Sequence, residues 1–248
     1  MRQSIAAILT AALLLTVLCS GCSAVRGPEI TTTTTTTVPS TAPVAEPKEE
    51  EPQTEIDPLY KEIIEKYRAA AEDKLSESEL LEQDLSPMLT LCYDDDPLES
   101  IGWLVTDLDG NSSNELVLGS ILGEESALHL LFAVYTIYGG QRKEIFVSQY
   151  RDRLYSCTGR MFLETGSGGA ANSLWMKFGL DGTGFAFIDG VYTDGFDDGE
   201  VRWYRATSDT ATADEGISIS EVEAMDLVEQ MEASTTGLSL VPLSEYKA

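Results

Sequence analysis

The sequence has a single histidine and few basic residues, with 16 lysines and arginines against 42 aspartates and glutamates. The lone His129 excludes a zinc site built on several histidines and a catalytic pair of histidines, since each needs a second imidazole. The net charge of −26 excludes nucleic acid as a partner, because phosphate contacts depend on clustered Lys and Arg. His129 stands in an apolar stretch, where a structural role is expected.

A recognisable catalytic motif is also lacking. Ser167 lies in a Gly-Ser-Gly-Gly run, but a nucleophile elbow needs glycine two residues before the serine, where Thr165 stands. The paired carboxylates of a glycoside hydrolase are defined by their separation in space, so a cell-wall or glycan hydrolase remains a minor alternative for so acidic a chain. We therefore expect a protein that is not an enzyme.

Hydrophobic runs are short, and the clearest one, from Ser4 to Leu18, falls below the roughly 20 residues that span a bilayer. With Arg2 before it and small residues after it, this run is typical of an export signal that is removed. The segment from Leu18 to Cys22 resembles the lipobox of bacterial lipoproteins, although Cys19 stands where leucine is usual. The resemblance implies that residues 1–21 are a signal peptide and that Cys22 carries a lipid anchor at the outer face of the cytoplasmic membrane. A plain secretory signal cut near residue 24 is the alternative.

Residues 22–56 are rich in Thr, Pro and Glu, including the run from Thr31 to Thr37. Such a segment has almost no apolar surface to offset the entropy of ordering, so we expect a disordered stalk. Residues 57–248 are long enough for one extracytoplasmic domain with its own core. This domain contains Cys92 and Cys157, and an isolated pair in an oxidising compartment allows either a disulfide or two separate buried thiols.

The pattern of the domain predicts an α+β fold. Helices are expected over about 58–72, as one helix or two short ones over 80–92, and over about 221–232. Between them, short runs of β-branched and aromatic residues alternate with glycine-containing turns such as Asp181-Gly182 and Asp198-Gly199. We expect an antiparallel β meander with two N-terminal helices and one C-terminal helix.

An acidic loop carries the clearest chemical signal. Oxygen-bearing side chains alternate at Asp107, Asp109 and Asn111, and are followed by the backbone carbonyl of Ser113 and the carboxylate of Glu115. Calcium takes six to eight oxygen ligands and is held by this alternation in turn-shaped loops. The sequence therefore predicts a structural calcium site, and the alternative is a turn whose carboxylates only cap backbone amides.

The loop resembles the FG-GAP calcium loop of integrin-type repeats and, more closely, a loop in surface lipoproteins of Gram-positive, Clostridia-type gut bacteria. A strand like 131–138, a segment like Tyr150-Arg151-Asp152-Arg153 and a small-residue run like 166–171 follow in the same order in those lipoproteins. That family usually has glycine at the sixth loop position, where the backbone tends toward positive φ, whereas this chain has Ser112. The resemblance implies calcium binding and no particular activity.

Two tryptophans suggest where a ligand would bind. Trp175 and Trp203 fall on expected strands and could line a groove, although aromatic rings in small domains more often belong to the core. Exposure and coplanarity of the two rings would favour a carbohydrate- or peptide-binding module, and full burial would favour a structural or adhesion role. We expect a membrane-anchored surface binding or adhesion module whose ligand is a cell-wall component, a glycan or a protein.

Overall fold

The computed structural model describes residues 56–93, 96–121, 130–169, 171–195, 199–212 and 214–247. The signal peptide, Cys22, His129 and all of the stalk except Ile56 lie outside these residues. Among the described residues, none of the helices is both long enough and apolar enough to cross a membrane.

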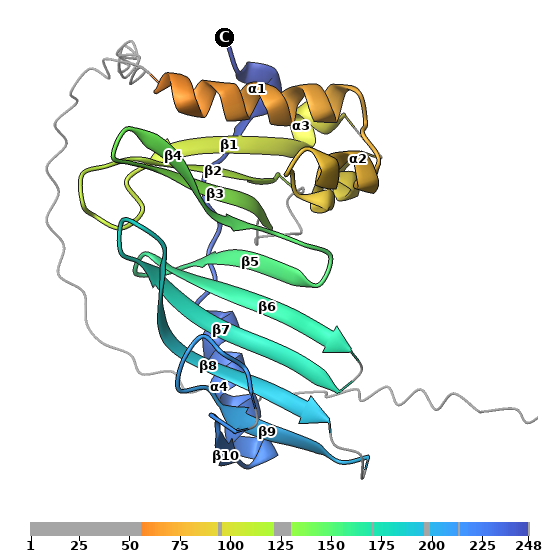
Figure 1. Ribbon diagram of the computed structural model, residues 1–248, viewed down its shortest axis with the longest axis vertical. Helices are drawn as coiled ribbons and strands as arrows, with labels where there is room; N and C mark the ends of the chain where they lie inside the picture. The colour runs from red at the N-terminus through yellow and green to blue at the C-terminus, as the bar shows by residue number, and fades with distance from the viewer. Residues whose placement is uncertain are drawn as a thin grey trace, which may run out of the picture. The chain divides into compact units, whose positions relative to one another are not determined.

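The predicted α+β class with a largely antiparallel sheet is confirmed. Within the described ranges, 11 strands form one sheet with the order β10-β9-β8-β7-β6-β5-β3-β2-β1-β11, and β4 pairs with β3 off this path (Figure 1). The strands are β1 (Ile101–Thr106), β2 (Glu115–Ser120), β3 (Leu131–Tyr138), β4 (Gln141–Val147), β5 (Asp152–Cys157), β6 (Met161–Gly169), β7 (Asn172–Leu180), β8 (Phe185–Gly195), β9 (Val201–Arg205), β10 (Ile217–Ile219) and β11 (Val241–Pro242).

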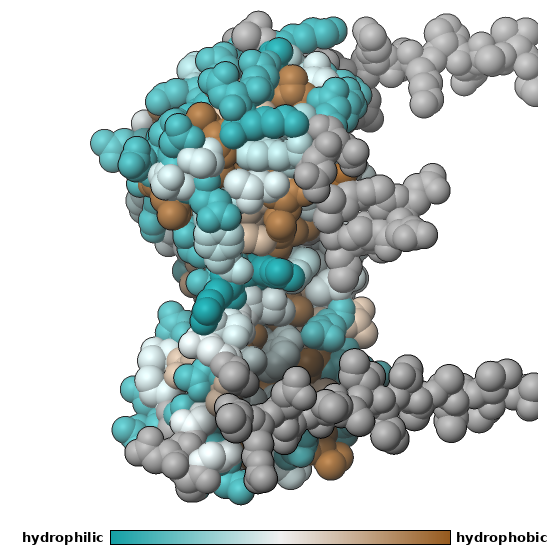
Figure 2. All heavy atoms as spheres, turned by 90° about the vertical axis from the view of Figure 1, so that its right-hand side faces the viewer, coloured by the Kyte–Doolittle hydropathy of each residue, from teal (hydrophilic) through white to brown (hydrophobic). Residues whose placement is uncertain are grey.

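The sheet is a meander from β5 to β10 but departs from one at two places. The C-terminal β11 returns to pair with β1, which brings Val241 opposite Trp103. Strand β4 occupies most of the free edge of β3, so β5 meets β3 only at the pair Leu131 and Leu154. The two halves of the sheet are therefore joined by a single register pair between β3 and β5. Figure 2 shows the molecule narrowed there, with strongly hydrophilic side chains on the surface of the narrow region.

Strand β6 runs further than its sequence suggests. Gly166 pairs with both β5 and β7, and β6 then continues to Gly169 in register with β7. A β-carbon at Gly166 would lie 2.9 Å from Oδ1 of Asp152 and 3.0 Å from Cγ of Leu174, so a larger residue would displace both side chains. Side chains from both neighbouring strands therefore pack over Gly166.

The helices cover separate parts of the sheet. They are α1 (Pro58–Glu72), α2 (Glu77–Glu82), α3 (Pro97–Ser100) and α4 (Glu221–Ala233), with the 3₁₀ helices η1 (Pro87–Cys92) and η2 (Leu243–Glu245). Asp57 caps α1 by accepting from the amide of Leu59 (2.8 Å), and Tyr60 and Ile64 then pack in a cluster with residues of β1 to β3. Helix α4 packs through Val228 and Met231 on the strands around β6 to β9.

The two cysteines of the domain are free thiols in the structure. Cys92 belongs to the cluster under α1, with its thiol 3.6 Å from the carbonyl of Ser100, whereas Cys157 belongs to the cluster under α4. Of the two alternatives that the sequence left open, the structure has two separate buried thiols, and the Cys92–Cys157 disulfide is not formed.

Candidate functional site

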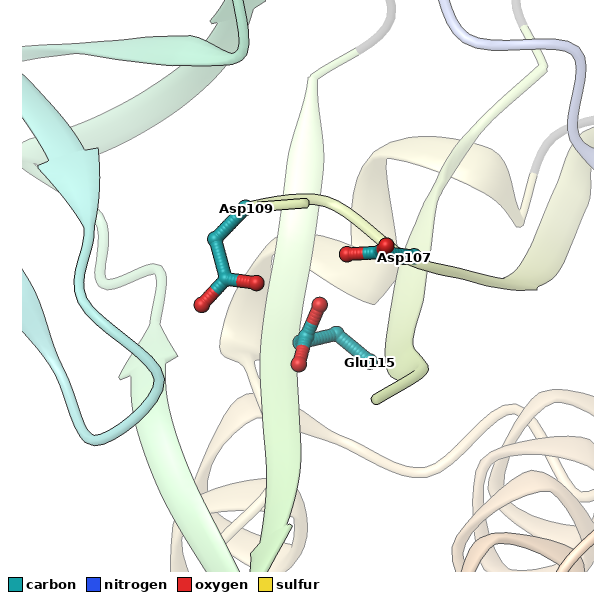
Figure 3. A group of neighbouring side chains, drawn as sticks. All are labelled: Asp107, Asp109 and Glu115. Atoms are coloured by element: carbon teal, nitrogen blue, oxygen red, sulfur yellow. The ribbon is translucent and has the colours of Figure 1, made fainter. Parts of the chain in front are cut away.

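The acidic loop joins β1 to β2 and is closed at its base by the register pair Thr106 and Glu115. Asp107 follows the last residue of β1, and Glu115 is the first residue of β2. Figure 3 shows the carboxylates of Asp107, Asp109 and Glu115 turned toward a common space, and one oxygen of each lies within 4.8 Å of the others. The structure thus brings together the three carboxylates that the sequence predicted as metal ligands.

The loop is curled around Asp107. One carboxylate oxygen of Asp107 accepts from the amide of Gly110 (2.6 Å), and the other accepts from the amide of Ser112 (3.0 Å). This curl requires positive φ at Ser112, which has φ 71°. The sixth loop position therefore has the conformation that favours glycine, and serine holds it at a cost of about 1 kcal/mol.

The other two predicted ligands, the Asn111 side chain and the Ser113 carbonyl, differ in their partners. The Asn111 side chain donates to Oδ2 of Asp109 (2.8 Å) and accepts from the amide of Ser113 (2.6 Å). No described residue donates a hydrogen bond to the carbonyl of Ser113. The Asn111 amide is thus engaged, whereas the Ser113 carbonyl has no donor among the described residues.

Glu115 is the buried member of the cluster, with 1% of its surface exposed. Its carboxylate accepts from the amide of Leu108 (2.9 Å) and from the hydroxyl of Thr136 (3.3 Å). Burial raises the pKa of Glu115 above its usual range, and the charges of Asp109 and Asp107 raise it further, against the opposing effect of these hydrogen bonds. The cluster therefore carries negative charge that its protein donors do not fully compensate.

Arg160, in the turn between β5 and β6, is a cation beside this loop that sequence reasoning missed. A β-carbon on Gly110 would overlap the Arg160 guanidinium, so the two groups are in close contact. Desolvation acts to raise the pKa of Asp107, but the amides of Gly110 and Ser112 together with the charge of Arg160 outweigh it, and the pKa is lowered. No local pattern could reveal this contact, because it depends on how β5 and β6 pack beside the loop.

The turn between β7 and β8 also lies against the loop. It is the hairpin turn predicted at Asp181-Gly182, and the Asp181 carboxylate accepts from the amides of Thr183 (3.1 Å) and Gly184 (3.0 Å). A β-carbon on Gly182 would lie 2.9 Å from Nδ2 of Asn111. Asp181 thus stabilises its own turn, whereas Gly182 leaves room for the acidic loop.

The two predicted groove tryptophans lie together but are neither fully exposed nor fully buried. Trp175 and Trp203 are half-buried and stack with ring centroids 6.2 Å apart and planes at 25°. The indole N–H of Trp175 donates to the Glu232 carboxylate at the end of α4 (3.0 Å). One face of Trp175 therefore packs toward Trp203, and its edge is fixed by α4.

A groove of about 780 Å³ lies beside Trp175 and has a floor and two sides. Its floor is the face of β5, β6 and β7 that carries Arg153, Thr165 and Trp175. One side is the Tyr150-Arg151 turn, and the other is Glu232 together with Thr235. The sequence feature that could have indicated this groove is the pair Arg151 and Arg153, two positions apart in a chain with few basic residues.

No protein-family model, curated protein or solved structure matches this chain. The acidic loop and the groove are therefore interpreted from their own geometry. The resemblance to lipoproteins of Gram-positive bacteria stays a prediction from the sequence.

Proposed function

We propose that the chain is an exported lipoprotein, anchored through Cys22, whose domain is a calcium-stabilised module for binding or adhesion at the cell surface and not an enzyme. The observation that carries the calcium assignment is the convergence of Asp107, Asp109 and Glu115. The alternation of oxygen-bearing residues along the loop supports it.

The spacing of the carboxylates suits calcium. Two oxygens bound to one calcium ion at about 2.3–2.6 Å from it lie at most about 5 Å apart. The oxygens of Asp107, Asp109 and Glu115 lie within 4.8 Å of one another, so one ion can contact all three without rearrangement of the strands. Asn111, the Ser113 carbonyl and water would complete the six to eight ligands.

The electrostatics of the loop supports the same assignment. Three carboxylates repel one another, and burial of Glu115 strengthens that repulsion. A divalent ion reverses the sign of the interaction and connects the end of β1 to the start of β2. The site would therefore stabilise the sheet at one hairpin, which is a structural role and requires no open coordination position.

A carbohydrate- or peptide-binding module is the second candidate, and one observation favours it. Trp175 lines an open groove in which two arginines also lie. This candidate is compatible with the first, since a calcium-stabilised domain can carry a ligand groove elsewhere. The minor alternative of a glycan hydrolase has no support of this kind from the geometry.

Calorimetric titration of the full chain with calcium tests the metal site directly. We expect saturable binding of one ion, abolished by Asp109→Ala. Asp226→Ala is the matched control, because it removes an exposed carboxylate from α4, away from the acidic loop, and it should leave binding unchanged. Equal binding by the wild type and Asp109→Ala would contradict the assignment.

Metabolic labelling with a fatty-acid analogue tests the anchor separately. We expect the label on the wild type and on Cys19→Ser, because Cys19 leaves with the signal peptide. Cys22→Ser should carry none. Equal labelling of Cys22→Ser and the wild type would show that the protein is not anchored through this residue.

A further inference from the structure

The groove beside α4 collects positive charge in a chain whose net charge is −26. Arg151 and Arg153 both line it, and their side chains are exposed. Neither guanidinium forms a hydrogen bond or ion pair with any described residue. Their donors are therefore free for a ligand, and a guanidinium fork matches a carboxylate with two parallel hydrogen bonds.

Three side chains on the floor of the groove form a row across the strands. The register of β5, β6 and β7 places Arg153, Thr165 and Trp175 in one row across the three strands, all on the same face. Neighbouring strands lie about 4.8 Å apart, so the backbone positions of Arg153 on β5 and Trp175 on β7 are about 10 Å from each other. A ligand that uses both must be long enough to span this separation.

The aromatic end of the row is held in a fixed orientation. Trp203 stacks on the side of Trp175 away from β6, and Glu232 accepts the indole N–H. Trp175 and its register partner Thr165 both line the groove. A rigid ring with hydroxyls and a carboxylate beside it suits a sugar, because the C–H face of a sugar packs on an aromatic ring while its hydroxyls bond to polar groups.

Two features favour an acidic saccharide over other anions. Strands β6 and β7 are paired on both sides, so the floor offers no free backbone to which a peptide could add as a strand. The Glu232 carboxylate lies in the same groove and repels anions, so a singly charged carboxylate is favoured over a doubly charged phosphate.

We infer that the groove between the Tyr150-Arg151 turn and the end of α4 binds a carboxylate-bearing oligosaccharide, with the acid group on Arg153 and a sugar ring on Trp175. The inference rests on the proposed surface-binding function and supplies its ligand class. It is independent of the calcium loop, none of whose residues lines the groove.

Calorimetric titration of the full chain with tetragalacturonate and with a hyaluronan tetrasaccharide tests this inference. The methyl ester of tetragalacturonate is the neutral control, and hexaglutamate is the acidic peptide control. We expect at least one acidic saccharide to bind, the methyl ester to bind at least about tenfold more weakly, and hexaglutamate not to bind. Absence of binding by both acidic saccharides, equal binding of the ester, or tighter binding of hexaglutamate would overturn the inference.

Variants locate the binding. Arg153→Gln and Trp175→Phe should each weaken binding of the acidic saccharide by about tenfold, with melting curves that show a folded domain. Arg68→Gln, an arginine on α1 that pairs with Glu72, is the matched control and should bind as the wild type does. Unchanged binding by Arg153→Gln would overturn the assignment.

Titration with and without a calcium chelator separates the two proposals. If the chain binds an acidic saccharide but not calcium, only the calcium site is wrong. If the chain binds calcium but neither saccharide, only the groove assignment is wrong.

Discussion

The guanidinium of Arg160 lies over Gly110, in close contact with the backbone of the acidic loop. This places a positive charge of the chain beside the Asp107 carboxylate, where it helps to lower the pKa against the opposing effect of desolvation. Arg160 therefore offsets part of the carboxylate repulsion when no metal is bound. A divalent cation in the loop would in turn be repelled by Arg160.

This arrangement predicts opposite effects of Arg160→Gln with and without calcium. Without calcium the variant should be slightly less stable than the wild type, because an exposed pair of opposite charges contributes little to stability. Its affinity for calcium should be higher by a few-fold, because the competing charge is gone. Chemical denaturation and calorimetry measure the two quantities, and Arg68→Gln controls for the loss of an arginine elsewhere. A lower calcium affinity in Arg160→Gln would contradict this role.

Ser112→Gly should stabilise the domain, since φ at this position is 71° and glycine adopts it without strain. The expected gain of about 1 kcal/mol corresponds to a rise of about 2–4 °C in melting temperature. Ser113→Gly is the matched control. It lies next in the loop, is not among the residues with positive φ, and should be neutral or destabilising. A lower melting temperature for Ser112→Gly than for the wild type would refute the assignment of strain.

Glu164 gives the domain a pH dependence that is separate from the acidic loop. Burial between Leu154 and Met176, and then the charge of Asp152, raise its pKa from 4.5 to about 7. Between these values the folded chain keeps a proton that the unfolded chain has lost. Stability from this group is therefore greatest near pH 4.5 and falls as the pH rises through about 7.

Glu164→Gln should remove this component. After allowance for solvent screening, the wild type should lose about 1–2 kcal/mol relative to the variant between pH 4.5 and pH 8. Urea denaturation at a series of pH values measures the difference, with the exposed Glu229→Gln on α4 as control. Parallel profiles for the wild type and Glu164→Gln would show that Glu164 titrates normally.

The two cysteines should be protected thiols in the folded chain. Burial raises the pKa of Cys92 to about 11 and raises that of Cys157 as well, so little reactive thiolate is present at neutral pH. Iodoacetamide should modify both only after denaturation, as mass spectrometry without reduction can show. A Cys92–Cys157 linked peptide from the exported protein would contradict the separation seen in the structure.

The sequence predicts those parts of the fold and site that depend on local pattern. The alternation from Asp107 to Glu115 located the acidic cluster, because alternate positions in such a loop point to its inner side. Cap and spacing signals likewise placed a helix after Asp57.

The sequence could not predict contacts between distant segments. The pairing of β11 with β1 involves two residues, Val241 and Pro242, whose composition gives no strand signal. The contact of Arg160 with Gly110 and the groove around Arg153 arise from the packing of strands far apart in the chain. The extension of β6 to Gly169 likewise depends on register pairs with β7, which lies further along the chain.

The melting temperature of the full chain in millimolar calcium, compared with the same chain in chelator, tests the calcium-stabilised domain most directly. A ligand that binds only the folded state at about 100 times its Kd contributes about 2.7 kcal/mol, which raises the melting temperature by about 5–11 °C for a domain of this size. Magnesium should raise it less, because it gives up its waters reluctantly. We expect this rise for the wild type and its absence in Asp109→Ala. The same melting temperature in calcium and in chelator would show that the acidic loop is only a turn.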